Sequence, residues 1–130
     1  MMKIDPHTYA EGFISEDEFQ IRARARGLEV GAKDASTGVG SYLRALAHQL
    51  SAQSVVEVGT GSGVGSLWIL GGMITSGTLT SIDDEMEHTQ IAKMAFADAE
   101  ISPTRYRLIT NSVLDVISKL TDRAYDLVVV

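Results

Sequence analysis

Glycine occupies every second position from residue 59 to residue 65, directly after a short β-branched run that contains Glu57. Glycine backbone adopts conformations closed to other residues and lets a ligand approach the main chain. Where a helix follows such a loop, its first N–H groups lack intrahelical partners and its dipole favours an anionic group. The stretch VVEVGTGSGVGSLWIL, residues 55–70, therefore predicts a ligand-binding loop between a strand and a helix.

Loops of this kind bind two classes of cofactor, the dinucleotides and S-adenosylmethionine. The dinucleotide spacing G-x-G-x-x-G fails here, because its third glycine falls on Val64 or on Ser66 in the two available registers. The spacing that fits is an acidic residue followed by alternating glycines: Glu57, Gly59, Gly61 and Gly63. It favours S-adenosylmethionine and disfavours a nicotinamide-dependent oxidoreductase.

Asp83 ends the next predicted strand, which places a carboxylate at the same edge of a parallel sheet as the glycine loop. A carboxylate there can accept two hydrogen bonds from the 2′,3′-diol of a ribose. The alternative is an ordinary cap or turn residue, a role for which Asp84 competes. For Glu57, the alternative is a half-buried acid that accepts hydrogen bonds from the loop amides.

Strands alternate with helices from residue 54 onward, which is typical of βαβ units and a doubly wound parallel sheet of the α/β class. We expect strands at 54–58, 77–83, 105–110 and 125–130. Helices are predicted at 16–31, with a Ser15–Glu18 capping box, and at 34–50, 63–72, 85–101 and 113–120. Residues 1–14 are expected to be irregular, and Pro103 should end the helix before it.

The apolar residues of these helices indicate which face each helix buries. Trp68 and Met73 are expected in the core. The expected inward residues of the other helices are Phe19, Ile21, Ala23 and Leu28; Val39, Tyr42, Leu43, Leu46, Ala47 and Leu50; and Ile91, Met94, Ala95 and Ala99. The arginine-rich helix at 16–31 is either a solvated helix or a surface that packs on a partner subunit, so we expect a homodimer.

The composition of the chain excludes or disfavours several other classes of function. The chain has 130 residues, a formal net charge of −6 and no cysteine, which excludes disulfides and a cysteine nucleophile. The negative charge argues against nucleic acid and anionic membranes as partners. No secretory leader and no apolar run near the ~18 residues of a membrane span is visible, so we expect a cytoplasmic protein. The three histidines lack metal-ligand spacing.

The stretches VVEVGTGSGVGSLWIL, LTSIDDEMEHTQIAKMAFADAEI and YDLVVV, taken in this order, resemble the class I S-adenosylmethionine-dependent O-methyltransferases of the catechol and caffeoyl-CoA type. The similarity is strongest to bacterial, particularly actinobacterial, members and runs from about residue 28 to the end. It implies a Rossmann-like fold with a helical lead-in at 1–35 and a cofactor domain at 36–130. It also implies methyl transfer to a hydroxyl of a small molecule.

The resemblance implies a set of residues that contact S-adenosylmethionine. They are Lys33, Glu57, Gly59, Thr60, Gly61, Gly63, Gly65, Asp83, Ser112 and Val113. Three of these positions depart from the family pattern. Lys33 replaces an apolar residue, Gly65 stands where serine is frequent, and Ser112 belongs to TNSVLDVI, which replaces a Gly-Asp-Ala type of start. In addition, Asp34-Ala35 replaces the family's Ser-Pro. His88 either touches the ligand or lies at the surface.

In this family an aspartate that binds a divalent metal follows the strand resembling YDLVVV, and here the chain stops at Val130. Three consecutive valines are typical of a buried parallel strand, although the family order 3-2-1-4 leaves this strand at an edge. We therefore expect a fragment or truncated product of a longer methyltransferase. The hypothesis places no catalytic residue within 1–130 and a metal such as Mg²⁺ only in the longer protein. The alternative is a non-catalytic cofactor-binding or dimerisation module.

Overall fold

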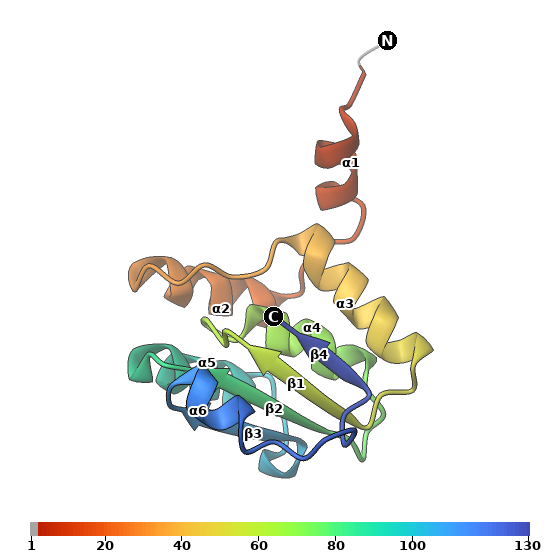
Figure 1. Cartoon of the computed structure of the whole chain (residues 1–130). Coiled ribbons are helices and arrows are strands. Elements are labelled where there is room, and N and C mark those ends of the chain that lie inside the picture. Colours follow the sequence, from red (N-terminus) through yellow and green to blue (C-terminus); the bar gives the residue numbers. More distant parts are fainter. Residues whose placement is uncertain (1–2) are drawn as a thin grey trace.

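The computed structural model describes residues 3–130, which form a four-stranded parallel sheet of order β3-β2-β1-β4 (Figure 1). The strands are β1 (Ser54–Val58), β2 (Thr78–Asp83), β3 (Tyr106–Thr110) and β4 (Leu127–Val129). The predicted strands and their order are confirmed, with β4 shorter than expected. In this order the chain reverses direction across the sheet beside β1, so the carboxyl end of β1 lies at the switch point where ligands bind.

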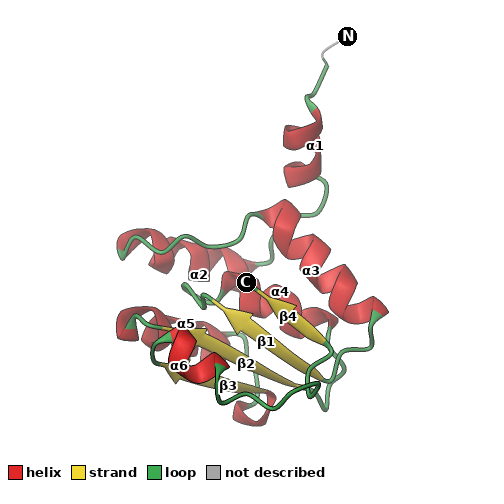
Figure 2. Cartoon of the chain, in the orientation of Figure 1, coloured by secondary structure: helices red, strands yellow, loops and turns green. Residues whose placement is uncertain are grey.

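The described part of the chain also contains six α-helices and one 3₁₀ turn, of which α1, α2 and α3 precede β1 and the others connect the strands. They are α1 (Pro6–Gly12), α2 (Glu18–Glu29), α3 (Thr37–Gln49), α4 (Val64–Gly72), α5 (Met86–Asp98), η1 (Pro103–Arg105) and α6 (Val113–Ile117). Figure 2 shows α2 to α5 gathered on one side of the sheet, α6 on the other, and α1 projecting away from both. We call the first side the packed face and the second the α6 face.

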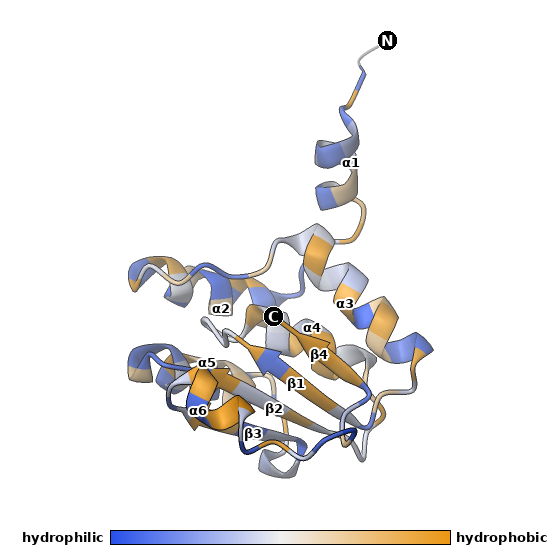
Figure 3. Cartoon of the chain, in the orientation of Figure 1, coloured by the Kyte–Doolittle hydropathy of each residue, from blue (hydrophilic) through white to orange (hydrophobic). Residues whose placement is uncertain are grey.

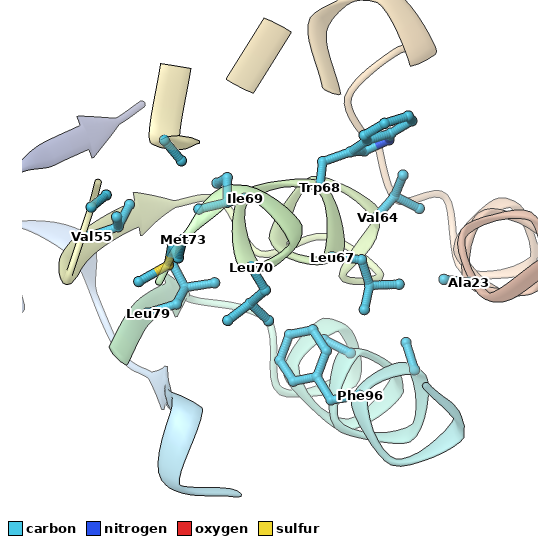
Figure 4. Packing of buried hydrophobic residues seen from close by; sticks show 14 residues of the cluster. Ala23, Val55, Val64, Leu67, Trp68, Ile69, Leu70, Met73, Leu79 and Phe96 are labelled. Carbon is cyan, nitrogen blue, oxygen red and sulfur yellow. The ribbon is translucent and has the colours of Figure 1, made fainter. Parts of the chain in front are cut away.

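The packed face holds most of the core. Helix α4 is apolar on all sides and lies between the sheet and its neighbouring helices, with Leu67 and Leu70 pointing toward Phe96 of α5 (Figure 4). Val55 and Leu79 contribute from β1 and β2. On the α6 face, the buried hydrophobic cluster consists of Val56, Ile82 and Val116, with partly buried apolar residues around them. Figure 3 shows that the helices of the packed face differ in hydropathy, with an apolar α4 and a largely polar α2.

The expectation of an irregular lead-in at 1–14 is wrong for residues 6–12, which form α1; residues 1–2 lie outside the described part. The Asp5 side chain caps this helix by accepting hydrogen bonds from the backbone N–H groups of His7 and Thr8, and Pro6 is its first residue. Both features are ordinary helix-start signals, but the helix has only seven residues and is too short to show an apolar period.

Helix α2 begins later than predicted and buries a partly different set of residues. Its capping box is formed by Asp17 and Gln20 rather than by Ser15 and Glu18. Ala23 is buried as predicted, and Phe19 packs partly buried against the core, but Ile21 and Leu28 are exposed. The helix also buries Gln20 and Gly27, which had not been predicted. The apolar pattern was misleading because α2 approaches α4 and α5 closely, and close approach selects small side chains at the contact.

The buried faces of α3 and α5 were also predicted incorrectly in part. Val39, Tyr42 and Leu50 of α3 are exposed, while Ala47 is buried. On α5, Met94 is exposed. The residues that α5 buries are Thr89, Ala92, Ala95 and Phe96. Helix α5 ends at Asp98, before Pro103, and Pro103 instead opens the 3₁₀ turn η1.

Strand β4 is an edge strand, and its valines are not buried as the run of three had predicted. It pairs only with β1, through the contacts Val55–Leu127, Val56–Val128 and Glu57–Val129. Val128 is 57% exposed and Val130 is 95% exposed. A continuous apolar run is typical of a strand covered on both faces, and here the α6 face is only thinly covered. The division of the chain at residue 35 stays a prediction.

Candidate functional site

The loop between β1 and α4 bends through three glycines with left-handed backbone, Gly59 (φ 92°), Gly61 (φ 56°) and Gly63 (φ 95°). At Gly59 a Cβ atom would meet nothing within 4 Å, so the backbone borders open space. At Gly63 a Cβ would lie 3.2 Å from the Ala92 Cα of α5. The loop therefore packs on α5 at its far end and faces a ligand-sized space at its near end.

Two adjoining pockets meet at Gly59 and Lys33. The β4-side pocket has a volume of about 280 Å³. It is lined by Lys33, Asp34, Ala35, Val39, Leu43, Glu57, Val58, Gly59, Thr60, Gly65, Val129 and Val130. The β2-side pocket has a volume of about 300 Å³. It is lined by Gly31, Lys33, Gly59, Gly61, Asp83, Asp84, Glu85 and His88. Together the pockets form an acidic cleft at the carboxyl ends of β1 and β2.

Glu57 lies at the floor of the β4-side pocket and is only 4% exposed. Its Oε1 atom accepts hydrogen bonds from the hydroxyls of Ser66 on α4 (2.5 Å) and Ser81 on β2 (2.7 Å). Burial raises the pKa of Glu57 from 4.5 to about 7, the two hydroxyls oppose this shift, and the nearby Asp34 and Asp83 add to it. A cation placed in this pocket would stabilise the charged form of Glu57.

Asp83 ends β2 and is 7% exposed. Its Oδ2 atom accepts a hydrogen bond from the Gly61 N–H at 3.0 Å, and its Oδ1 atom accepts one from the Glu85 N–H at 2.9 Å. His88 Nδ1 lies 3.3 Å from Asp83 Oδ2 and lines the same pocket. Asp83 therefore accepts hydrogen bonds from two backbone N–H groups. Each carboxylate oxygen can accept a further hydrogen bond, and the residue lines the pocket from which a ligand could donate it.

Asp34 is a site residue that the sequence analysis missed. It does not cap α3, because the side chain of Ser36 caps that helix. The Asp34 carboxylate instead accepts from the N–H of Ser62 at 2.8 Å and from its hydroxyl at 2.5 Å. No local pattern predicts this contact, because the two residues are far apart in the chain; the only available signal was the departure from Ser-Pro.

The structure brings most of the predicted cofactor residues together and leaves two of them apart. Lys33, Glu57, Gly59, Thr60, Gly61, Gly65 and Asp83 line one or both pockets. Gly63, at the far end of the loop, is buried against α5 and lines neither pocket. Ser112 precedes α6 and is exposed, and Val113 packs on the α6 face; neither lines the two pockets. Their contact with an adenine stays a prediction.

Among residues 3–130, no group of three or more histidine or acidic side chains is placed to hold a metal ion. None of the described helices combines the length and the apolar character that crossing a membrane requires.

The strand order, the glycine loop after β1 and the acid at the end of β2 define a Rossmann-like domain of the class I methyltransferase type. No protein-family model matches the chain. Proteins of Mycobacterium sp. strain KMS and Mycobacteroides abscessus, both assigned by name to the O-methyltransferases, are 49% and 46% identical to it. These alignments cover 92% and 95% of this chain. They cover 54% and 57% of the relatives, so the chain spans about half the length of the curated relatives it matches.

Two solved structures share the fold of this chain. A Corynebacterium glutamicum protein is 34% identical, with a TM-score of 0.85, over 94% of this chain and 58% of that one. The O-methyltransferase TomG of Streptomyces achromogenes, solved with S-adenosylmethionine, is 23% identical with a TM-score of 0.82, over 92% of this chain and 56% of that one. The second likeness shows the fold alone. The chain is thus similar over most of its length to proteins assigned by name to the O-methyltransferases, and it shares the class I methyltransferase fold, as the resemblance predicted.

Proposed function

We propose that this chain is the cofactor-binding part of an S-adenosylmethionine-dependent O-methyltransferase. The observation that carries this proposal is that two consecutive N–H groups of the glycine loop already donate hydrogen bonds to carboxylates of the protein itself. Asp83 accepts from Gly61 N–H and Asp34 accepts from Ser62 N–H. A pyrophosphate would meet these negative charges instead of free donors. S-adenosylmethionine has no phosphate and carries sulfonium and ammonium cations, which suit an acidic cleft.

The residues around the two pockets fit such a cofactor. Asp83 would accept hydrogen bonds from the ribose hydroxyls, and the open backbone at Gly59 leaves room for a ligand against the main chain. Glu57 and Thr60 would line the amino-acid side, with Lys33 at the junction of the pockets. The bound cofactor supplies an electrophilic methyl group. The part of this chain is to hold and orient the cofactor, because positioning accounts for much of such a reaction.

The acceptor in this proposal is a hydroxyl group of a small molecule, in keeping with relatives assigned by name to the O-methyltransferases. Within residues 1–130 we assign no catalytic residue. A divalent metal such as Mg²⁺ belongs to the proposal only for a longer protein. Cytoplasmic localisation is likewise proposed, with neither nucleic acid nor membrane as a partner.

We also propose that the protein is a homodimer that pairs through α1 and α3. These helices border a hollow of about 550 Å³. Its rim exposes four large apolar side chains: Tyr9, Phe13, Val39 and Tyr42. Burying such side chains against a second copy removes apolar surface from water. Light scattering after size exclusion should give the mass of a dimer for the wild-type chain and of a monomer for Tyr42→Asp. A wild-type monomer would contradict the dimer.

Calorimetric titration with S-adenosylhomocysteine tests cofactor binding directly. We expect binding by the wild-type chain and a loss of about 100-fold in Asp83→Ala, because hydrogen bonds to a charged acceptor are removed. Asp126→Ala is the matched control: Asp126 also accepts from two backbone N–H groups, those of Gln53 and Ser54, at the opposite end of β1. Its affinity should equal that of the wild type.

The same titration separates the alternatives. NAD in place of S-adenosylhomocysteine should give no binding, and NAD binding would favour an oxidoreductase. A folded wild-type chain that binds neither compound would favour a non-catalytic interaction module. Methyl transfer by a longer protein that contains this chain would separate an enzyme from a module that only binds the cofactor.

A further inference from the structure

The segment between α2 and α3 forms one wall of both pockets. Lys33 lines both, and Asp34 and Ala35 line the β4-side pocket. This segment has no regular structure of its own. Its position relative to the glycine loop therefore depends on specific contacts.

Asp34 makes the contact on the inner side. Its two carboxylate oxygens accept from the N–H and the hydroxyl of Ser62, a residue with 0% exposure. Hydrogen bonds to an ionised acceptor are about twice as strong as those between neutral groups. The two bonds converge on one residue of the glycine loop, so they fix both the distance and the orientation of the wall.

The carboxylate of Asp34 lies in a slot between two glycines. A Cβ atom at Gly27 of α2 would lie 2.4 Å from Asp34 Oδ2 and 2.7 Å from Ser62 Oγ. A Cβ atom at Gly61 would lie 2.5 Å from Asp34 Oδ1. The space at both positions is filled by the Asp34–Ser62 pair. The contact is thus built into the packing of α2 against the glycine loop.

A second contact holds the outer side of the same wall. The Arg24 guanidinium of α2 donates to the Ala35 carbonyl at 2.5 Å, and the same guanidinium pairs with Glu16. Asp34 and Ala35 are therefore tied in opposite directions, one to the glycine loop and one to α2. Lys33 lies directly before these two anchors and is exposed.

We propose that Asp34 is a positioning residue for the cofactor: its contact with Ser62 holds the 33–35 wall against the glycine loop before the ligand arrives. This inference rests on the proposed function, because it assigns a role in binding S-adenosylmethionine. Pre-ordering of a pocket wall increases affinity, because less conformational entropy is lost on binding. Without the contact, the wall must be ordered at the moment of binding.

Three variants test this proposal by titration with S-adenosylhomocysteine and by amide hydrogen exchange of the ligand-free chain. Asp34→Ala should weaken binding about tenfold, in line with losing hydrogen bonds to a charged group, and should speed exchange at residues 31–36. Asp34→Asn keeps an acceptor for the Ser62 N–H and should recover most of the affinity, leaving a loss of about threefold. Ser62→Ala removes the hydroxyl bond alone and should fall between them. Asp126→Ala is again the control that removes two backbone contacts outside the pockets.

Each outcome decides the proposal. Weaker binding by Asp34→Ala, partial recovery by Asp34→Asn and unchanged binding by Asp126→Ala support it. Wild-type affinity in Asp34→Ala overturns it, and so does an equal loss in Asp126→Ala, which would indicate a global effect. If Asp34→Ala does not fold, wild-type affinity in both Asp34→Asn and Ser62→Ala overturns it. A folded wild-type chain that does not bind overturns the proposed function and this inference together, whereas binding by wild type and Asp34→Ala alike overturns the inference alone.

Discussion

The two faces of the sheet differ in how completely they are covered. The packed face buries a cluster of 14 hydrophobic residues under α2 to α5 (Figure 4), whereas the buried hydrophobic cluster of the α6 face has three. The side chains of Glu57 and Ser81 share the packed face with Val55 and Leu79, since alternate residues of a strand point the same way. The candidate site is therefore built on the better-packed face, and its geometry depends little on what covers the other.

The largest expected effect on stability comes from Phe96, which is 0% exposed on the packed face and lies 4.7 Å from the Tyr106 ring, between centroids. Phe96→Ala should lower the free energy of unfolding by about 3–5 kcal/mol. Met94→Ala is the control on the same helix, with a side chain that is 55% exposed, and should change it by less than about 0.5 kcal/mol. Urea denaturation measures both. Equal losses would contradict the burial of α5 described above.

A smaller loss is expected where α4 packs against α3. At Gly72 a Cβ would lie 2.1 Å from the Arg44 carbonyl oxygen, whereas at Gly71 the nearest atom is 3.6 Å away. Gly72→Ala should destabilise the protein by about 1–3 kcal/mol, because backbone must move to admit the methyl group. Gly71→Ala should be neutral or up to about 1 kcal/mol stabilising, since alanine favours helix. If both substitutions are tolerated equally, α3 and α4 are not in such close contact.

The same substitution on each face compares the two directly. Val64 on α4 is 0% exposed and Val116 on α6 is 8% exposed. Val64→Ala should cost about 2 kcal/mol, and Val116→Ala about 1 kcal/mol or less, because fewer buried neighbours surround the side chain. The difference in urea midpoint between these two variants measures how unequal the faces are. A larger loss for Val116 would show that α6 carries more of the stability than its burial indicates.

The smallest effect is a dependence of stability on pH through Glu57. Its pKa is raised by burial from 4.5 in an unfolded chain to about 7 in the folded protein. The folded state therefore binds the proton more tightly, and this contribution to stability is complete below pH 4.5 and is lost as the pH rises through 7. Denaturation of the wild type and of Glu57→Gln at several pH values should show a decline with rising pH in the wild type alone. Parallel curves would mean that Glu57 is already ionised in the folded protein.

Strand positions and sheet order were predictable from the sequence, because β-branched runs and glycine loops are local signals. The buried faces of the helices were harder to predict from the sequence. Met94 fits the apolar pattern of α5, yet Phe96 and the small residues around it are buried, because the geometry of packing decides which face turns inward. Helix α1 was not predicted, although an aspartate followed by a proline, here Asp5 and Pro6, is typical of a helix start.

The candidate site likewise contains residues that the sequence predicted and one that it did not. Glu57, the glycines and Asp83 follow from spacing along the chain, and the structure places all of them except Gly63 around two adjoining pockets. Asp34 could not be predicted, because its partner Ser62 lies on another segment and becomes a neighbour only after α2 has packed on the glycine loop. Tertiary contacts of this kind leave no periodic trace in a single sequence.

The slot that holds the Asp34 carboxylate links positions on three different segments: α2, the 33–35 wall and the glycine loop. Because a Cβ at Gly27 would collide with both Asp34 and Ser62, an alanine there should be harmful in the native background and less so beside Asp34→Gly, which removes one of the two colliding side chains. The two substitutions would then show partial positive epistasis, each altering the effect of the other. During divergence, Gly27, Asp34 and Gly61 would be expected to change as a set, so that a lineage could leave this arrangement only through paired replacements.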